Sequence, residues 1–205
     1  NLAELDNIFD FIEEENINRV CFYHLVYSGR GNQMVEEDVS PAESRQAMET
    51  IIRRTVDFEK RGLRKEVLTV DNHCDGVYLY LRALKENPEK AQSIKDLIGR
   101  NGGNRSGIAF GAVDPAGYVH PDQFTQHISF GNVRERKFGD IWTDMSHPIL
   151  AGLKDRKPLL KGRCAKCQFL DICNGNFRTR AQAVTGDFWE SDPACYLTDA
   201  EIGLK

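Results

Sequence analysis

Apolar positions in the first hundred residues follow two different spacings. Over residues 1–17 they recur every three or four positions with acidic residues between them, which predicts an amphipathic helix. The segments 19–26 (RVCFYHLV) and 66–70 (EVLTV) are short, apolar and free of Gly and Pro, as is typical of buried strands. Between the strands, the sequence Ser-Pro-Ala-Glu predicts the start of a helix over residues 40–60.

The order of these elements predicts the class of fold. Two further helices are expected over 76–87 and 88–100, so the first half reads helix, strand, helix, strand, helix. Such alternation implies right-handed crossovers between parallel strands. Two strands do not complete a parallel sheet, so we expect the sheet to continue in a preceding segment. On this interpretation the chain is the C-terminal portion of a larger protein.

The pattern changes after residue 100. The segment 101–107 (NGGNRSG) is a glycine-rich junction. Two short apolar stretches, 108–113 and 118–120, then flank the turn sequence Asp-Pro-Ala-Gly, which predicts a β-hairpin. We therefore expect two domains, an α/β portion over 1–104 and a small α+β portion over 105–205.

Composition excludes several classes of protein. Hydrophobic residues make up 40% and charged residues 28% of the 205 positions, which is ordinary for a globular protein. The net charge of -4 gives no electrostatic basis for binding nucleic acid. No apolar run approaches the roughly 20 residues needed to span a membrane. We expect a cytoplasmic monomer.

Four of the six cysteines gather near the C-terminus. Cys164, Cys167 and Cys173 form a C-x2-C-x5-C run, and Cys195 follows after 21 further residues. A C-x-x-C turn aims two sulfurs at one point, and two more thiols complete a tetrahedral set. Disulfides are the alternative, but they need an oxidising compartment, which we do not expect here. The spacing predicts a four-cysteine site and leaves zinc and an iron–sulfur cluster both open.

Polar side chains follow both predicted strands. Ligands of parallel α/β folds bind at the carboxyl ends of the strands, so the loops 24–31 and 71–76 are expected to meet a ligand. Taken singly, each polar residue in these loops also fits a purely structural place. Of the remaining cysteines, Cys21 fits a buried apolar position, and we expect no catalytic role for it or for Cys74. The ligand candidates in the two loops are His24, Tyr27, Ser28, Arg30, Asn72 and His73.

Several strings resemble the radical SAM enzymes that carry a SPASM or twitch extension, and among them the NirJ-like enzymes of haem d1 biosynthesis. The resemblance covers about Asn18 to Gly203. It implies the C-terminal part of a partial (β/α)6 barrel, followed by a small α+β iron–sulfur domain with a β-hairpin. The strings are CFYHLVYSGRG, EVLTVDNHCDG, NGGNRSG, VHPDQF, GNVRER, GRCAKC, CNGNFRTRA and DPACYLTDAEIG.

The resemblance also implies the cofactors. In this family a C-x3-C-x2-C loop holds the 4Fe–4S cluster that binds S-adenosylmethionine (SAM), and no such loop occurs in this sequence. Those ligands would therefore lie upstream. Full SPASM domains hold two auxiliary clusters, but Asp122 and Phe177 stand at two of the second cluster's cysteine positions. The resemblance thus implies one auxiliary 4Fe–4S cluster on the four C-terminal cysteines. Complete thiolate ligation favours an electron-transfer role for it.

The implied activity is that of an oxidoreductase or lyase acting on an iron tetrapyrrole. NirJ-like enzymes replace two propionates of 12,18-didecarboxysirohaem by oxo groups, and an electron donor is a further partner. The alternatives within the superfamily are a haem-decarboxylating or a peptide-modifying enzyme. An alternative from another class is a zinc-binding module without catalysis.

Roles for individual residues follow from that activity as expectations. Ser28 and Asn72 would lie on the SAM side. His24 and His73 are the catalytic candidates, to meet the iron or move a proton. Arginine forks onto carboxylates, so the arginines are candidates for the substrate's acidic groups. The residues expected to contact the substrate are Tyr27, Arg30, Arg105 and His120.

Overall fold

A parallel pair of strands organises the first half of the computed structural model, which describes residues 1–204. Strand β1 (Arg19–Tyr23) pairs with β2 (Glu66–Val70) along its whole length. Helix α2 (Pro41–Lys60) connects the two strands. The predicted parallel pairing is therefore confirmed. The chain is a mixed helix and strand structure with small sheets.

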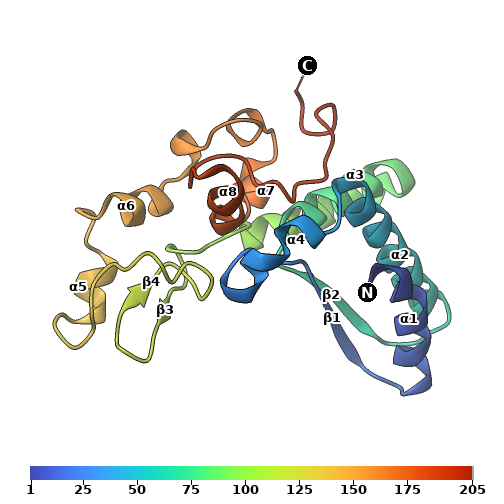
Figure 1. Cartoon of the computed structure of the whole chain (residues 1–205). Helices are drawn as coiled ribbons and strands as arrows, with labels where there is room; N and C mark the ends of the chain where they lie inside the picture. Colours follow the sequence, from blue (N-terminus) through green and yellow to red (C-terminus); the bar gives the residue numbers. More distant parts are fainter. Residues whose placement is uncertain (205) are drawn as a thin grey trace.

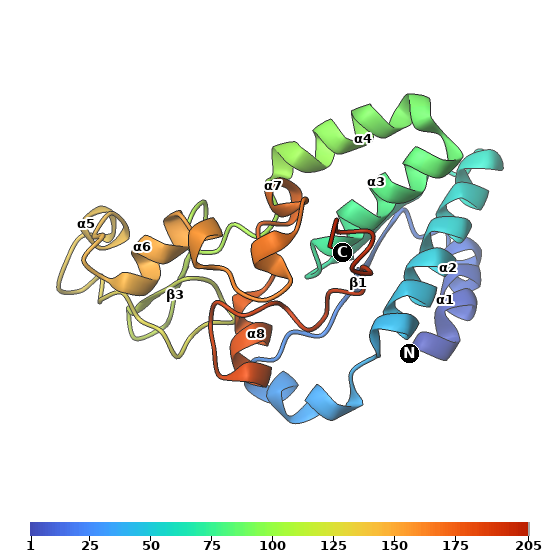
Figure 2. The same ribbon diagram turned by 90° about the horizontal axis from the view of Figure 1, so that it is seen from above.

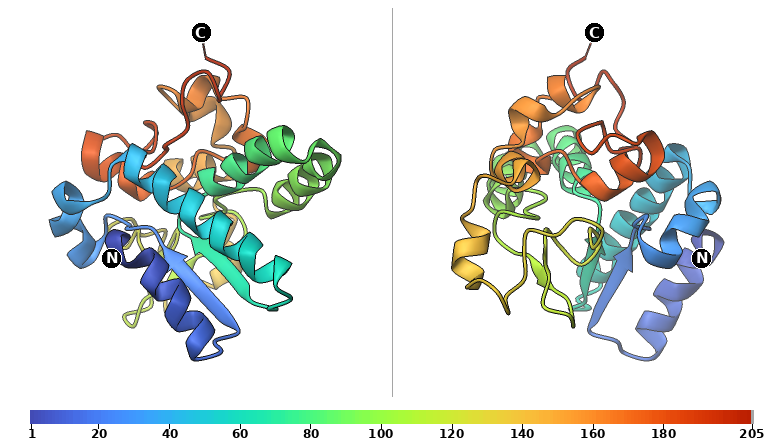
Figure 3. Two further views of the ribbon diagram at one scale, coloured as in Figure 1. Left: turned by 90° about the vertical axis from the view of Figure 1, so that its right-hand side faces the viewer. Right: turned by 60° about the vertical axis from the view of Figure 1, so that its left-hand side comes forward.

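Helices cover one face of this strand pair (Figure 3). The chain begins with the short 3-10 helix η1 (Leu2–Glu4) and continues as α1 (Leu5–Glu14). The ring of Phe9 in α1 stacks on Phe22 of β1 with 5.3 Å between ring centroids. This contact is the centre of a core that buries α1 and α2 against the strands.

The start of α2 follows the sequence prediction closely. The Ser40 hydroxyl accepts from the Glu43 amide at 3.3 Å, and the Glu43 carboxylate accepts from the Ser40 amide at 2.7 Å. Pro41 occupies the first helical position. Because this reciprocal capping satisfies amides that have no partner within the helix, the boundary is fixed by local sequence.

Three details of the strands and their following segments differ from the prediction. The first strand ends at Tyr23 instead of residue 26, because β2 ends at Val70 and offers only one further bond, from the His24 amide at 3.0 Å. The residues that follow form the 3-10 helix η2 (Gly29–Glu37) in place of a loop. Helix α3 (Cys74–Glu86) begins two residues early, because the Asn72 side chain accepts from the amide of its first residue at 3.3 Å.

Helices α3 and α4 (Pro88–Asn101) lie side by side, joined by a turn at Asn87 (Figure 2). The Asn87 side chain accepts from the Lys90 amide at 3.4 Å and caps α4. At the other end Gly102 takes a left-handed conformation and terminates α4.

The predicted hairpin is present but short. Strands β3 (Ala112–Val113) and β4 (Val119–His120) pair in antiparallel fashion. Residues 108 and 109 do not join β3, because their amides bond back to the carbonyl of Arg105 at 3.0 Å. Helices α5 (Phe138–Trp142) and α6 (Pro148–Lys154) pack beside the hairpin on a second small core. That core comprises Val119, Phe130, Ile141, Leu150, Leu153 and Phe188.

The last part of the chain packs between the two cores (Figure 1). It contains the 3-10 helices η3 (Lys157–Leu159) and η4 (Cys164–Lys166), and the helices α7 (Leu170–Cys173) and α8 (Arg178–Thr185). Its apolar side chains join the core of α1, α2 and α3, among them Phe169, Ile172, Tyr196, Leu197 and Ile202.

Two expectations about the fold stay predictions. The strand pair with its helices is compatible with part of a (β/α)6 barrel, and the division at residues 104 and 105 is one way to describe the chain. None of the helices described over residues 1–204 has the length and apolar character to cross a membrane.

Candidate metal centre

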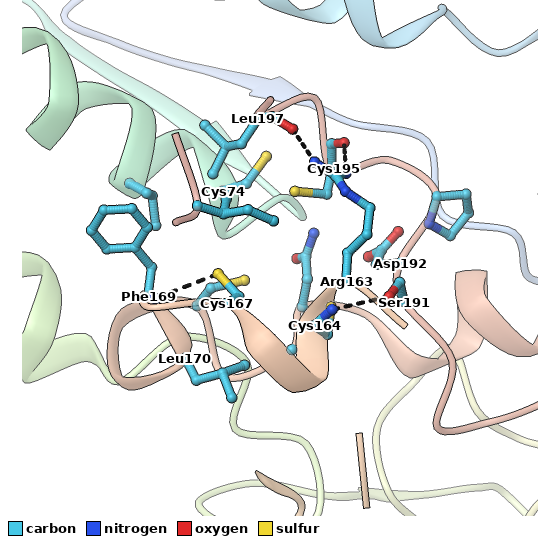
Figure 4. A pocket seen from close by; sticks show the side chains of 16 residues that line it. Cys74, Arg163, Cys164, Cys167, Phe169, Leu170, Ser191, Asp192, Cys195 and Leu197 are labelled. Atoms are coloured by element: carbon cyan, nitrogen blue, oxygen red, sulfur yellow. Dashed lines mark hydrogen bonds between the residues drawn. The ribbon is translucent and has the colours of Figure 1, made fainter. Parts of the chain in front are cut away.

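The four C-terminal cysteines line a single cavity of about 150 Å³ (Figure 4). Cys164 begins η4, Cys167 follows that turn, Cys173 ends α7, and Cys195 lies on the irregular stretch after α8. None of the six cysteines, all of which lie in the described residues, forms a disulfide. The structure thus brings together residues that the spacing alone predicted to meet.

The cavity has room for more than a single metal ion. Over residues 1–204, no three Cys, His, Asp or Glu side chains converge closely enough to hold one metal ion. The thiols instead border a shared space roughly ten times that needed by one water molecule. Zinc requires all four sulfurs at about 2.3 Å from one point, whereas a four-iron cluster offers a separate iron to each thiolate.

The third cysteine is held by two glycine- and asparagine-rich loops. The Asn104 amide donates to the Cys173 carbonyl at 3.1 Å, and the Asn174 side chain donates to the Asn104 carbonyl at 2.7 Å. A side chain on Gly103 would overlap the Cys173 backbone, so only glycine allows this approach. The junction 101–107 therefore positions a predicted ligand.

The first two cysteines are held by hydrogen bonds that their own segment supplies. The Cys164 amide donates to the Ser191 hydroxyl at 3.1 Å, which in turn donates to the Lys161 carbonyl at 3.1 Å. The Phe169 amide donates to the Cys167 sulfur at 3.4 Å (Figure 4). An amide aimed at sulfur stabilises the thiolate form, which is the form that binds metal.

Two arginines lie against the cysteine segment. Arg163 borders the cavity and donates to the carbonyls of Cys195, at 3.5 Å, and of Leu197. Arg178 is buried, and its guanidinium donates to the main-chain carbonyls of Gly175, Phe188 and Glu190. Their positive charges favour thiolates nearby.

Burial acts in the opposite direction on the thiols themselves. It raises the pKa of Cys167, and it raises the pKa of Cys173 well above its ordinary value. In the metal-free protein these thiols therefore keep their protons. Metal binding must release them, which makes the affinity of the site depend on pH.

A fully buried ion pair joins the cysteine segment to the end of β1. The Arg180 guanidinium meets the Asp192 carboxylate at 2.9 Å, and neither side chain is accessible to solvent (0% each). Arg180 also donates to the Leu25 carbonyl at 3.0 Å, and Asp192 accepts from the Phe177 amide at 2.9 Å. The pair fixes the cavity relative to the segment after β1, which carries His24.

A second link uses the loop after β2. The Asn176 side chain donates to Asn72 at 2.7 Å, and the Asn72 side chain donates to the Ala194 carbonyl at 3.0 Å. The His73 amide donates to Asn176 at 2.9 Å. Asn72 was expected on the side that binds SAM. Both polar atoms of its side-chain amide are instead hydrogen-bonded within the chain.

Sequence reasoning gave no role to Cys74, yet its side chain lines the same cavity and is fully buried. Its sulfur lies 4.0 Å from the Ala194 carbonyl oxygen, and the neighbouring Cys74 thiol lowers the pKa of Cys195. Burial raises the pKa of Cys74 well above its ordinary value. Cys74 lies far from the cysteine run in sequence, so no spacing rule could have found it.

The two positions where the family has second-cluster cysteines hold packing residues. The Asp122 carboxylate accepts from the amides of Phe124, at 2.9 Å, and Thr125, at 2.8 Å, and so shapes a buried turn. The Phe177 ring lies against His73, with 5.9 Å between centroids, and under the guanidinium of Arg180.

A larger groove of about 1280 Å³ lies at the end of β1. It is bordered by α1, α2, η2 and the segment 123–127. Of the residues predicted to meet a ligand, His24 and Ser28 line it. Ser28 donates to the Phe124 carbonyl at 2.6 Å.

The other predicted contact residues lie away from the lining of this groove in the described structure. The Tyr27 hydroxyl donates to Asp38 at 2.8 Å and is buried, which raises its pKa. Burial lowers the pKa of His73 to about 4. His120 is buried, with Nδ1 2.7 Å from the Ile128 carbonyl. Arg30 and Arg105 are exposed.

Comparison with known proteins places this geometry in context. Residues 109–168, which include the hairpin and the first two cysteines of the run, match the SPASM family, described as an iron-sulfur cluster-binding domain. "Fe-coproporphyrin III synthase" of Methanosarcina barkeri is 59% identical over 99% of this chain and 52% of its own length. "Pre-heme d1 synthase" of Dinoroseobacter shibae is 39% identical over 99% of this chain and 50% of its own length.

A third similar protein, "AdoMet-dependent heme synthase" of M. barkeri, is 28% identical over 95% of this chain and 52% of its own length. The chain thus spans about half the length of these curated relatives.

Proposed function

We propose that this chain, whose residues 109–168 match the SPASM iron-sulfur cluster-binding domain, belongs to the radical SAM proteins with a SPASM-type domain, and that Cys164, Cys167, Cys173 and Cys195 hold one auxiliary 4Fe–4S cluster. The observation that carries the proposal is the single cavity these four thiols line. When bound, a cluster with a thiolate on each iron supplies one-electron transfer. The chain contributes the four sulfurs, the amide aimed at Cys167 and the neighbouring arginines.

For the whole protein we propose a SAM-dependent activity on an iron tetrapyrrole in haem biosynthesis. The names of three relatives that match nearly all of this chain support it. A C-x3-C-x2-C loop does not occur in the 205 residues, so the SAM-binding cluster would use ligands outside them. An electron donor for the auxiliary cluster is part of the same proposal.

The balance of similarity favours Fe-coproporphyrin III as the product. The relative named for that product is 59% identical over nearly the whole chain, and the relative named for pre-haem d1 is 39% identical. The haem d1 role expected from sequence strings alone was therefore narrower than the comparisons support. Pre-haem d1 formation remains the second candidate, because that relative covers the same residues.

The contacts that hold the cysteine cavity against the strand ends support an electron-relay role for the cluster. The Arg180–Asp192 pair and the Asn72–Asn176 pair hold the cysteine segment against the ends of β1 and β2. Electron transfer requires a fixed separation between donor and acceptor. Buried, fully hydrogen-bonded contacts of this kind provide that rigidity.

The test is to identify the product. Anaerobically prepared protein with its clusters loaded is mixed with 12,18-didecarboxysirohaem, SAM and dithionite. The tetrapyrroles are then separated, and their masses are determined by mass spectrometry. We expect Fe-coproporphyrin III. A mass matching pre-haem d1 would support the second candidate, and a tetrapyrrole left unchanged in the presence of SAM would overturn the proposed activity.

A further inference from the structure

His24 directly follows the carboxyl end of β1. Its Nε2 lies 2.9 Å from a carboxylate oxygen of Asp75, and its ring borders the large groove. The His24 side chain keeps 16% of its surface exposed, whereas that of Asp75 keeps only 6%. The other carboxylate oxygen of Asp75 accepts from the Tyr196 hydroxyl at 2.7 Å. Asp75 is thus held from behind while His24 faces open space.

This arrangement fixes which nitrogen of His24 is available. An ionised carboxylate only accepts hydrogen bonds, so the Nε2 beside Asp75 carries the hydrogen. Nδ1 is then left with its lone pair. Within residues 1–204 no hydrogen bond occupies Nδ1, and it is not among the buried polar atoms that lack a partner. An imidazole nitrogen with a free lone pair beside a groove is a ready metal ligand.

We propose that His24 binds the iron of the tetrapyrrole substrate through Nδ1, with Asp75 orienting the ring. This inference rests on the proposed function for the identity of the ligand. Histidines that bind metals usually donate their other N–H to a carboxylate, which fixes the ring and raises its basicity. The His24–Asp75 pair has the same arrangement, and His24 borders the groove. The reaction at the iron is a ligation only, with no change in oxidation state.

The walls of the groove are mixed, because apolar side chains and the carboxylates of Glu37, Asp38 and Asp71 both border it, with no Arg or Lys among its described lining residues. Apolar side chains border it from β1, η2 and the segment after β4, as expected for a site that buries a large ligand. Asp71, at the end of β2, also lines the groove, and burial raises the pKa of its carboxyl group. The apolar lining includes Val20, Phe22, Leu25, Val26, Met34 and Phe124.

The other histidines are placed less well for this role. His127 also lines the groove, but its Nε2 meets the neutral amide of Gln182 at 2.7 Å and its side chain is exposed. The ring of His73 stacks on Phe177, and His120 is a buried residue of strand β4. His127 therefore serves as a matched control, because it shares the groove and lacks a carboxylate partner.

One carboxylate would then connect the two sites. Asp75 holds His24 on the groove side and Tyr196 on the cavity side, and Tyr196 directly follows Cys195. The substrate iron and the cluster would lie on opposite sides of this residue. Substituting Asp75 is therefore expected to affect iron binding without removing any of the four cysteine sulfurs.

The inference is tested by binding ferric coproporphyrin III to the cluster-loaded protein, with metal-free coproporphyrin III as the control ligand. Pulsed electron paramagnetic resonance of the bound ferric iron should show a coupled histidine nitrogen. His24→Ala should lose that coupling and bind the iron compound about tenfold or more weakly, whereas His127→Ala should keep both. Added imidazole should restore coupling to an imidazole nitrogen in His24→Ala.

The outcomes separate the two proposals. Metal-free coproporphyrin III should bind the parent and His24→Ala equally, and equal cluster iron in the two proteins shows that the variant is folded. Retained histidine nitrogen coupling in His24→Ala, beyond the coupling of the porphyrin's own nitrogens, would overturn the role of His24 alone. Absence of the histidine coupling in the parent, with both porphyrins bound, would do the same. Failure of the parent to bind either porphyrin would overturn the tetrapyrrole function itself.

Discussion

At the scale of the residue, burial decides the protonation of His73. Its ring lies against Phe177, and desolvation lowers its pKa from 6.5 to about 4. As the pH falls, His73 therefore becomes protonated near pH 6.5 in the unfolded chain but only near pH 4 in the folded chain. The contribution of His73 to stability is full above pH 6.5 and is lost as the pH falls toward 4.

This sign gives a prediction for unfolding in urea. Between pH 6.5 and 5 the free energy of unfolding should fall with a slope approaching about 1.4 kcal/mol per pH unit from this group. His73→Phe keeps an aromatic ring beside Phe177 and removes the proton, so its slope over that range should be flatter. Parallel pH profiles for the two proteins would show that His73 titrates normally.

The Arg180–Asp192 pair should be among the costliest contacts to break. Removing the cation leaves Asp192 buried without its partner, and such losses typically destabilise by about 3–5 kcal/mol. We expect Arg180→Met to lose that amount in a denaturation experiment. Arg53→Ala removes an exposed ion pair with Asp6, and it should cost no more than about 1 kcal/mol. Similar losses of unfolding free energy in the two variants would contradict the view that burial determines how much an ion pair contributes to stability.

At the scale of the element, the glycine-rich junction before the hairpin is a support for the metal centre. Gly103 has φ +66° and lies against the Cys173 backbone, whereas Gly62 has φ +74° with open space around it. Gly62→Ala should cost about 1–2 kcal/mol from the left-handed conformation alone. Gly103→Ala should cost about 1–3 kcal/mol more, because backbone cannot move aside as a flexible side chain does.

The same pair of variants separates stability from cluster binding. Gly103→Ala should release iron to a chelator faster than Gly62→Ala, because the carbonyl of Cys173 loses its bond from Asn104. Equal rates of iron release would mean that the junction does not position Cys173.

Local sequence was sufficient where local contacts decide the structure. The capping residues Ser40 and Glu43 predicted the start of α2, and the apolar run of residues 66–70 predicted β2. Local sequence was not sufficient where a residue's contact partner is distant in the chain. The length of β1 is set by where β2 ends, and Cys74 enters the cavity only because α3 packs on the cysteine segment. The Asp75–Tyr196 bond likewise joins residues 121 positions apart.

At the scale of the whole molecule, the cysteine cavity lies at a junction between two parts of the chain. Its lining comes from α3, through Cys74 and Val77, and from the C-terminal segment after residue 162. The same segment adds Phe169, Tyr196 and Ile202 to the core of the first half. A cluster bound there binds only the folded state, so it should stabilise both parts together.

The most direct test of the account is the iron and sulfide content of single-cysteine variants prepared anaerobically. Cys167→Ala should lose about four irons and four sulfides per chain relative to the parent protein, because one missing ligand opens the cluster. Cys21→Ala, which alters a thiol in β1 outside the cavity, should lose none. Unchanged iron in Cys167→Ala, or stoichiometric zinc in the parent after reconstitution with iron and sulfide, would contradict the assignment of a 4Fe–4S cluster to these cysteines.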